Sequence, residues 1–372
     1  MTKTGDIIQQ IEQFAPSYLA EDWDPIGLAF GANDQKVNRM MIALDLDANT
    51  LAEAKEKNID FIFTHHPSIF GSLKTLNEHD TRRKEYIELI RSNIALYSAH
   101  TNIDAAENGM NDWLAAEMAL KGPYETMGTS YQSPLSLLVL YTPHAEAQNM
   151  RTALYEIGAG QVGEYSNVSY TTEGKGHFTP DQEANPAIGK ENQAENVAEE
   201  RAEILFPNHL LSKVIETIYK HHPYEEPVFH ILDTGKTGKT YGIGRVGALS
   251  TPETLSSLID KVKESFSLPH VRYANTDLNT EIKKVAILGG SGEKYYKKAL
   301  AKGADLYITG DISYHGAQDM IRDGLLFIDV GHFIENIFVE KMTEKLNEWK
   351  QEKDWDIEII PAESQEDVFR FK

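Results

Sequence analysis

The chain has 372 residues, of which 41% are hydrophobic and 25% charged, which is typical of a globular protein of about two or three domains rather than a disordered or fibrous one. No apolar run approaches the roughly 20 residues of a membrane span, and the N-terminal segment has no apolar signal region, so we expect a cytoplasmic protein. The net charge of −21 disfavours binding to nucleic acid or anionic membranes, and the absence of cysteine restricts any metal site to histidine and carboxylate ligands.

The first third of the chain alternates predicted helices with short apolar strands. Apolar residues from Ile7 to Phe14 recur on one helical face, and Pro16 helps to end that helix. Strands are predicted at residues 40–46, 61–63 and 95–97, and further helices at 51–58, 82–92 and 108–120. Strands that alternate with helices of this length indicate an α/β architecture with largely parallel strands.

The pattern changes at about residue 122, where Gly122 and Pro123 begin a loose segment. The polar tract 174–200 contains two prolines and few apolar residues, which predicts a long loop. Around it, strands are predicted at 135–141, 166–172, 201–207 and 227–232, and helices at 145–158 and 209–222. This order predicts an inserted α+β unit of the ferredoxin-like βαβ–βαβ type at residues 129–240.

The α/β alternation resumes at Gly242. Helices are predicted at 254–266, 294–303, 314–324 and 334–349, and strands at 285–290, 306–310 and 326–330. The chain therefore divides into a first α/β lobe at 1–128, the inserted unit at 129–240, and a second α/β lobe at 241–372.

Histidines and carboxylates follow three of the predicted strands directly. The strand at 61–63 leads into His65 and His66, the strand at 95–97 into His100 and Asp104, and the strand at 326–328 into His332 and Glu335. Since the carboxyl ends of parallel strands line the ligand crevice of an open sheet, we expect these side chains to meet. The set His65, His66, Asp104, His332 and Glu335 could hold two divalent cations, and mixed imidazole and carboxylate ligands suit Zn, Mn, Fe, Co or Ni.

Each of these residues also has an ordinary structural interpretation. A His-His pair is more often a surface or capping feature, and His100 beside a strand is more often a core or supporting residue. Asp104 could be a helix cap, and Glu335 could be a first-turn residue favoured by the helix dipole. Only their coincidence at three strand ends favours a metal site.

The string His-His-Pro recurs at residues 221–223, where it follows a predicted helix instead of a strand. There the favoured interpretation is a helix end, with His222 and Glu225 as candidates for an accessory site. Ser291 and Gly292 in a glycine-rich turn are candidates for anion binding, although the lysine of a P-loop is missing. Arg272 is a second candidate anion contact, and Asp311 and His315 could face the crevice as catalytic or supporting residues.

The ordered motifs resemble those of the NIF-three-like dinuclear metal-centre family, whose members often carry the name GTP cyclohydrolase type-two homologue. The resemblance rests on seven segments of the two lobes, namely DWDPIGLAFG (22–31), FTHHP (63–67), SAHTNID (98–104), GIGRVG (242–247), VAILGGSG (285–292), TGDISYH (309–315) and GHFIE (331–335). The middle unit is similar to the PII/CutA-like insert of the longer bacterial members, with HPYEEP (222–227) as its marker.

The resemblance implies two α/β lobes facing across a cleft, a toroidal homohexamer, and two metal ions held by His65, His66, Asp104, His332 and Glu335. It makes Glu335 the bridging ligand, although some members place this glutamate four residues after the histidine, and here the spacing is three. The implied activity is hydrolysis of a nucleotide or related heterocycle, with GTP as the named candidate and His100 or His315 moving protons. A metal-dependent phosphoesterase and a non-enzymatic regulatory or metal-handling hexamer with a small-molecule-sensing insert stay open as alternatives.

Overall fold

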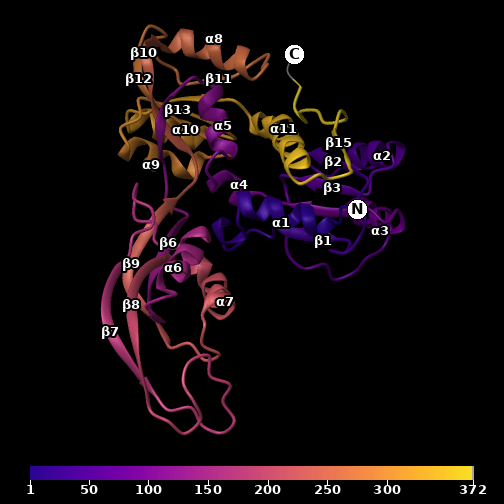
Figure 1. Ribbon diagram of the computed structural model, residues 1–372. Helices are drawn as coiled ribbons and strands as arrows, with labels where there is room; N and C mark the ends of the chain where they lie inside the picture. Colours follow the sequence, from indigo (N-terminus) through magenta and orange to yellow (C-terminus); the bar gives the residue numbers. More distant parts are fainter. Residues whose placement is uncertain (371–372) are drawn as a thin grey trace. The chain divides into compact units, whose positions relative to one another are not determined.

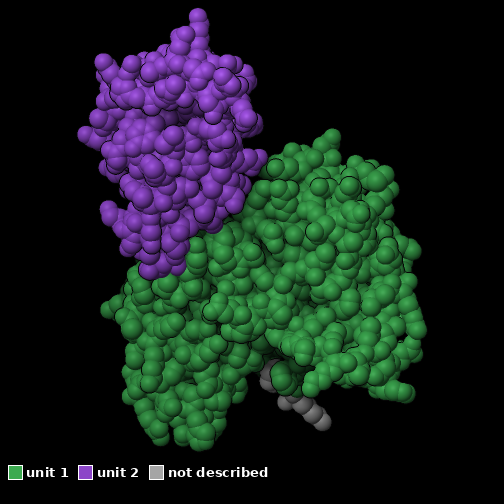
Figure 2. All heavy atoms as spheres, turned by 90° about the horizontal axis from the view of Figure 1, so that it is seen from below, with its two compact units in different colours: residues 1–131, 241–372 green, residues 132–240 purple. Residues whose placement is uncertain are grey.

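The computed structural model describes residues 1–370 and groups the chain into two compact units. Unit 1 comprises residues 1–131 and the chain from Tyr241 onward, and unit 2 comprises Gln132–Thr240 (Figure 2). Among the described residues, no helix combines the length and the apolar composition that crossing a membrane requires.

Unit 1 contains two mixed sheets (Figure 1). The first has five strands in the order β1-β4-β3-β2-β15. Strands β2, β3, β4 and β15 run parallel to their neighbours, whereas β1 pairs with β4 in the antiparallel sense. The strand bounds are β1 (Gly27–Phe30), β2 (Arg39–Ala43), β3 (Phe61–Thr64), β4 (Ala95–Ser98) and β15 (Glu358–Pro361).

The second sheet of unit 1 has six strands in the order β11-β14-β13-β12-β10-β5. Its central strands β12, β13 and β14 are parallel, and β10, β5 and β11 join them in antiparallel pairs. The bounds are β5 (Lys121–Thr126), β10 (Arg245–Thr254), β11 (Arg272–Tyr273), β12 (Glu281–Ser291), β13 (Leu306–Gly310) and β14 (Leu326–Asp329).

The helices of unit 1 begin where side chains satisfy free backbone amides. Asp47, Asp80, Thr254 and Ser313 each accept a hydrogen bond from the amide three residues later, which caps α2, α3, α8 and α10. The α-helices are α1 (Thr4–Phe14), α2 (Ala48–Glu56), α3 (Thr81–Arg91), α4 (Thr101–Ala105), α5 (Met110–Glu117), α8 (Leu255–Ser265), α9 (Tyr296–Ala301), α10 (Tyr314–Arg322) and α11 (Ile337–Glu352). Short 3₁₀ segments are η1 (Ser17–Leu19), η3 (Glu293–Tyr295) and η4 (His332–Asn336).

Alternating side chains bury both faces of each sheet. In β3, Phe61 and Phe63 join a core that also receives apolar residues of α1, α5, α8 and α11, whereas Ile62 packs on the opposite face against α2 and α3. In the second sheet, Ile308 belongs to the shared core and Tyr307 to a separate cluster with α9 and α10. Strands covered on both faces are nearly all apolar and end abruptly at polar residues, so chemistry is confined to their ends.

Unit 2 is a four-stranded sheet in the order β7-β8-β6-β9 with two helices. Leu138, Leu140 and Ile204 of the sheet pack against Leu154 of α6 and Ile218 of α7 in a core of their own. The elements are β6 (Tyr131–Pro143), α6 (Ala147–Glu156), β7 (Tyr170–Phe178), β8 (Glu195–Pro207), η2 (Asn208–Leu210), α7 (Leu211–His221) and β9 (Phe229–Tyr241).

The predicted loop at 174–200 is wrong at both ends. Strands β7 and β8 pair in register from Tyr170↔Glu203 to Phe178↔Glu195, so only residues 179–194 lie between them. The cause is exposure: β7 is an edge strand whose side chains are mostly exposed, so it needs no apolar alternation. The α/β class predicted from the sequence is confirmed, whereas the cleft between lobes, the ferredoxin-like type of the insert and the boundaries 1–128, 129–240 and 241–372 stay predictions.

Candidate metal centre

Two adjacent histidines leave the end of β3 together. The amide of His65 donates to the carbonyl of Ala43 (3.2 Å), and that of His66 donates to the carbonyl of Leu44 (3.0 Å), so the backbone continues along the edge of β2. The two ring centroids lie 5.1 Å apart. His65 is fully buried and His66 half-buried, so both imidazoles are fixed at the end of the sheet.

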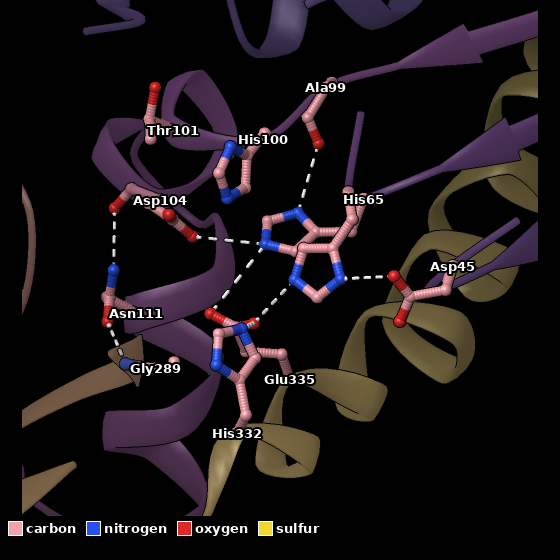
Figure 3. A network of polar contacts seen from close by, with 12 residues as sticks. Asp45, His65, Ala99, His100, Thr101, Asp104, Asn111, Gly289, His332 and Glu335 are labelled. Atoms are coloured by element: carbon pink, nitrogen blue, oxygen red, sulfur yellow. Dashed lines mark hydrogen bonds and ion pairs between the residues drawn. The ribbon is translucent and has the colours of Figure 1, made fainter. Parts of the chain in front are cut away.

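The second contribution comes from the segment that follows β4. Asp104 lies in the short helix α4 and is buried. Its carbonyl accepts a hydrogen bond from the side-chain amide of Asn111 (3.0 Å), whose own oxygen accepts from the amide of Gly289 in β12 (3.1 Å). This chain of contacts ties the end of the first sheet to the second (Figure 3).

The third contribution comes from η4, which follows β14. A 3₁₀ helix has three residues per turn, so side chains three apart lie on the same side. His332 and Glu335 are placed in this way, and Nε2 of His332 lies 3.2 Å from Oε2 of Glu335. In a 3₁₀ helix a spacing of three residues therefore brings the two side chains together, as a spacing of four does in an α-helix. Gly290, at φ +59°, leaves room for the carboxylate, because a Cβ there would lie 2.5 Å from Oε1 of Glu335.

Glu335 lies at the centre of the cluster and presents its two oxygens to different neighbours (Figure 3). Its Oε1 is 3.9 Å from Nε2 of His65, which in turn is 3.7 Å from Oδ1 of Asp104. Its Oε2 is 3.0 Å from Nε2 of His66 and 3.2 Å from that of His332. Three sets of ligand atoms could each hold a metal ion, with atoms within 4.8 Å of one another, namely His65–Asp104–Glu335, His66–His332–Glu335 and His65–His66–His100.

The outer nitrogen of each imidazole has a partner of its own. Nδ1 of His65 faces the carbonyl of Ala99 at 3.1 Å, Nδ1 of His66 faces Asp45 at 2.8 Å, and Nδ1 of His332 faces Asp311 at 2.6 Å. Partners of this kind fix the ring orientation and tautomer of metal-binding histidines. All three Nε2 atoms are thereby turned toward Glu335.

Two buried polar atoms at this place have no hydrogen-bond partner among the described residues: Nε2 of His65 and Oδ1 of Asp104. An unpartnered buried nitrogen or carboxylate oxygen costs about 1–3 kcal/mol or more, so native proteins rarely retain one without a function. Both atoms are metal-ligand types, and they lie 3.7 Å apart. The residues present therefore fit a bound cation.

The residues of the cluster shift the pKa values of one another. Burial would raise the pKa of Glu335, but hydrogen bonds from His332 and His66 outweigh it and hold that pKa well below its usual value. Burial would lower the pKa of His66, yet its contacts with Asp45 and Glu335 raise it to about 10. Burial lowers the pKa of His65 and, with the charge of Glu335, raises that of Asp104 to about 7. Protonated imidazoles thus compensate the negative charge of Glu335. A metal cation bound by the same residues could replace these protons.

His100 borders the cluster, its ring 5.1 Å from that of His65 and 5.6 Å from that of His66. Its Nδ1 faces Asp24 at 3.1 Å. Burial opposes the charged imidazole, but the hydrogen bond with Asp24 and the charges of Asp104 and Asp24 together outweigh it and raise the pKa of His100. His100 is therefore oriented toward the cluster and can hold a proton there.

Other predicted residues lie elsewhere in unit 1 or are engaged in the fold. Arg272 forms an ion pair with Asp329 and donates to the carbonyl of Ile312, and His315 is exposed beside Gln318. Ser291 is exposed, whereas Gly292 is buried and its carbonyl accepts from the Tyr307 hydroxyl. Their predicted roles in anion binding and catalysis stay predictions.

In unit 2, His222 is buried and both of its ring nitrogens are used. Nε2 contacts the carbonyl of Tyr141 at 2.9 Å, and Nδ1 accepts from the amide of Tyr224 at 3.1 Å. Glu225 accepts a hydrogen bond from the amide of Asn185. Neither residue belongs to a group of potential metal ligands among the described residues.

Sequence reasoning missed Asp45 and Asp24, the carboxylates that orient His66 and His100. Asp45 lies just beyond β2, the strand next to β3, but the predicted strand 40–46 extends past it, so the rule that pointed to the other strand ends did not reach it. Asp24 lies in the segment 22–31 that carries part of the family resemblance, but it follows no strand, so the strand-end rule did not point to it.

The family model described as Duf34/NIF3 (NGG1p interacting factor 3) matches residues 2–367. The chain belongs to the Duf34/NIF3 family. This member is 38% identical to a Bacillus subtilis protein named GTP cyclohydrolase 1 type 2 homolog, over 98% of this chain and 97% of that one. A protein of the same name from Halalkalibacterium halodurans is 36% identical, over 98% of both chains.

Solved structures agree with the family assignment. The Bacillus cereus protein related to NIF3 superposes on this Duf34/NIF3 member with a TM-score of 0.92 at 34% identity, covering 100% of this chain and 99% of that one. The Staphylococcus aureus protein SA1388 gives a TM-score of 0.78 at 28% identity with the same coverage. The recognition made from the seven motifs is thereby confirmed.

Proposed function

We propose that His65, His66, Asp104, His332 and Glu335 hold two divalent metal ions, with Glu335 shared between them. The observation that carries the proposal is the division of Glu335 between two ligand sets, one of which contains buried atoms without a partner. Three imidazoles and two carboxylates are a donor set for Zn, Mn, Fe, Co or Ni rather than for Mg or Ca.

The function that best suits this centre is hydrolysis of a nucleotide or related heterocycle. Divalent ions in such a site supply Lewis acidity and activate water near neutral pH. Removal of C8 from guanine as formate requires hydrolysis of two C–N bonds, consumes two water molecules and moves a proton to each departing nitrogen. His100 suits that task, because Asp24 holds its Nδ1 and leaves Nε2 free to give up or accept a proton. The names of the relatives point to the same chemistry.

The test is release of formate from GTP by protein reconstituted with Zn, Mn or Fe. Formate should appear with wild type and disappear with His65→Ala, whereas the matched variant His222→Ala should keep the activity because His222 lies outside the ligand sets. Metal-replete protein that leaves a panel of nucleotides unchanged would refute the hydrolase. Inorganic phosphate released in place of formate would support a metal-dependent phosphoesterase.

We also propose the finer architecture that the family resemblance implies. It comprises two lobes at 1–128 and 241–372 that face across a cleft, and a ferredoxin-like insert at 129–240. Each lobe gives one strand to the other, since β5 belongs to the second sheet and β15 to the first. The strand order β7-β8-β6-β9 with helices α6 and α7 supports the insert. A homohexamer is the expected assembly, and sedimentation equilibrium should return six times the 41.8 kDa chain mass. A non-enzymatic hexamer would bind a small molecule through unit 2 without turnover.

A further inference from the structure

An exposed aromatic ring stands at the border of the candidate metal centre. Trp23 has an exposed fraction of 56%, and it is the only exposed tryptophan among the described residues. Its ring meets that of His100 edge-on, with centroids 6.0 Å apart. Because His100 lies against His65 and His66 and belongs to one of the three ligand sets, the indole lies next to that set.

The backbone that carries this indole is held in place through the next residue in the chain. Asp24 accepts hydrogen bonds from the amide (2.9 Å) and hydroxyl of Thr101, and its other oxygen faces Nδ1 of His100. These contacts join the segment of Trp23 to the start of α4, which also supplies Asp104. A large apolar ring that is exposed to solvent on a fixed backbone offers a surface on which another ring can stack.

Cations accompany the ring in a chain with a net charge of −21. Nζ of Lys294 lies 5.8 Å from the Trp23 ring centroid and 5.0 Å from that of Tyr295, and Nζ of Lys298 lies 5.0 Å from the latter. Neither lysine has a carboxylate within 4.0 Å in the described part of the chain. Since cation–π contacts extend to about 6 Å, the contact of Lys294 with Trp23 is at its outer limit and is easily exchanged for a stronger one.

We propose that Trp23 and Lys294 form a binding subsite for a planar heterocycle that carries a phosphate. The heterocycle stacks on the exposed indole, and the ammonium group of Lys294, assisted by Lys298, moves from the ring to the phosphate. Stacking on an aromatic side chain tolerates different bases, so the subsite selects for shape and charge. This inference rests on the proposed function, because it places the substrate beside the centre that acts on it.

The experiment measures binding of GMP and guanosine to the metal-loaded protein by calorimetry. Trp23→Ala should raise the Kd of both ligands about ten-fold, whereas Trp23→Phe should restore most of the affinity. Lys294→Gln should raise the Kd of GMP about five-fold and leave that of guanosine unchanged, because guanosine has no phosphate. Lys297→Gln is the matched control and should alter neither, since Lys297 lies over Tyr296 instead.

Absence of GMP binding by wild type, or equal affinities of wild type, Trp23→Ala and Lys294→Gln, would overturn the subsite. Formate release distinguishes this failure from that of the hydrolase. If GMP binding depends on Trp23 and Lys294 but the protein releases no formate, the subsite is supported and the proposed hydrolase activity is refuted. Formate release with a KM for GTP unchanged in Trp23→Ala overturns the subsite and leaves the activity standing.

Discussion

The tripeptide His-His-Pro occurs twice in this protein, in two different surroundings. At residues 65–67 it follows the buried strand β3, and both imidazoles meet carboxylates from distant parts of the chain. At residues 221–223 it ends helix α7, and His222 is satisfied by two backbone groups. The same three residues thus lie in a cluster of candidate metal ligands in one place and at a helix end in the other.

The two His-His-Pro strings differ in the groups that surround the Nε2 atoms of His65 and His222. In unit 1, Nε2 of His65 is buried without a hydrogen-bond partner and faces Asp104 and Glu335. In unit 2, the carbonyl of Tyr141 already occupies Nε2 of His222. A short motif therefore predicts chemistry only when its structural position leaves the reactive atom free.

The largest expected effect is on metal content. Glu335→Gln removes the carboxylate shared by two ligand sets, so we expect the affinity for Zn to fall by more than the roughly 10–100-fold typical of losing a supporting residue. Elemental analysis after dialysis should then find the variant nearly metal-free. His222→Ala should retain the wild-type content, and equal metal loss in both variants would erase the contrast between the two strings.

A smaller effect is expected where a carboxylate only orients a histidine. Asp45→Ala removes the partner of Nδ1 of His66, so we expect Zn affinity to fall by about 10–100-fold. Competition with a chelator of known affinity gives the number. Asp34→Ala is the control, since Asp34 is exposed and outside the ligand sets. An unchanged affinity in Asp45→Ala would show that packing alone fixes the ring.

The strand ends of the candidate centre can be predicted, because strands buried on both faces appear in the sequence as apolar runs with clear ends. Apolar runs such as Phe61–Phe63 and Leu326–Ile328 end at polar residues, and the predicted residues His65, Asp104 and Glu335 do come together. The orienting partners were harder to find. The carbonyl of Ala99 has no side-chain signature, and Asp24 reaches His100 across 76 residues.

Exposed strands left a weaker signal. The tract 174–200 predicts a loop although it contains the ends of β7 and β8, because the side chains there are polar and largely exposed. Their pairing is set by backbone hydrogen bonds, which do not depend on side-chain polarity. Composition therefore predicts buried strands well and edge strands poorly.

The second string should instead affect local stability. His222→Ala removes two hydrogen bonds of a buried imidazole and leaves the carbonyl of Tyr141 without that partner, so we expect a loss of about 1–3 kcal/mol in unit 2. Hydrogen exchange of peptides from α7 and β6 should accelerate, whereas peptides from β3 should not change. Faster exchange confined to β3 would contradict this assignment.

The smallest expected effect separates the two strings by pH. Burial lowers the pKa of His222 below the usual histidine value of 6.5, despite its hydrogen bonds and the nearby charge of Glu199. The unfolded state therefore binds the proton more readily than the folded state. The contribution of neutral His222 to the stability of unit 2 is therefore fully present above pH 6.5. It declines as the pH falls from there toward the lowered pKa. His222→Gln, which does not titrate, should lack this part of the decline when protection factors of α7 are compared at neutral and mildly acidic pH. Identical declines in wild type and variant would show that His222 is as easily protonated in the folded chain as in the unfolded one. Burial of its imidazole would then not distinguish it from a histidine that is free to bind a ligand.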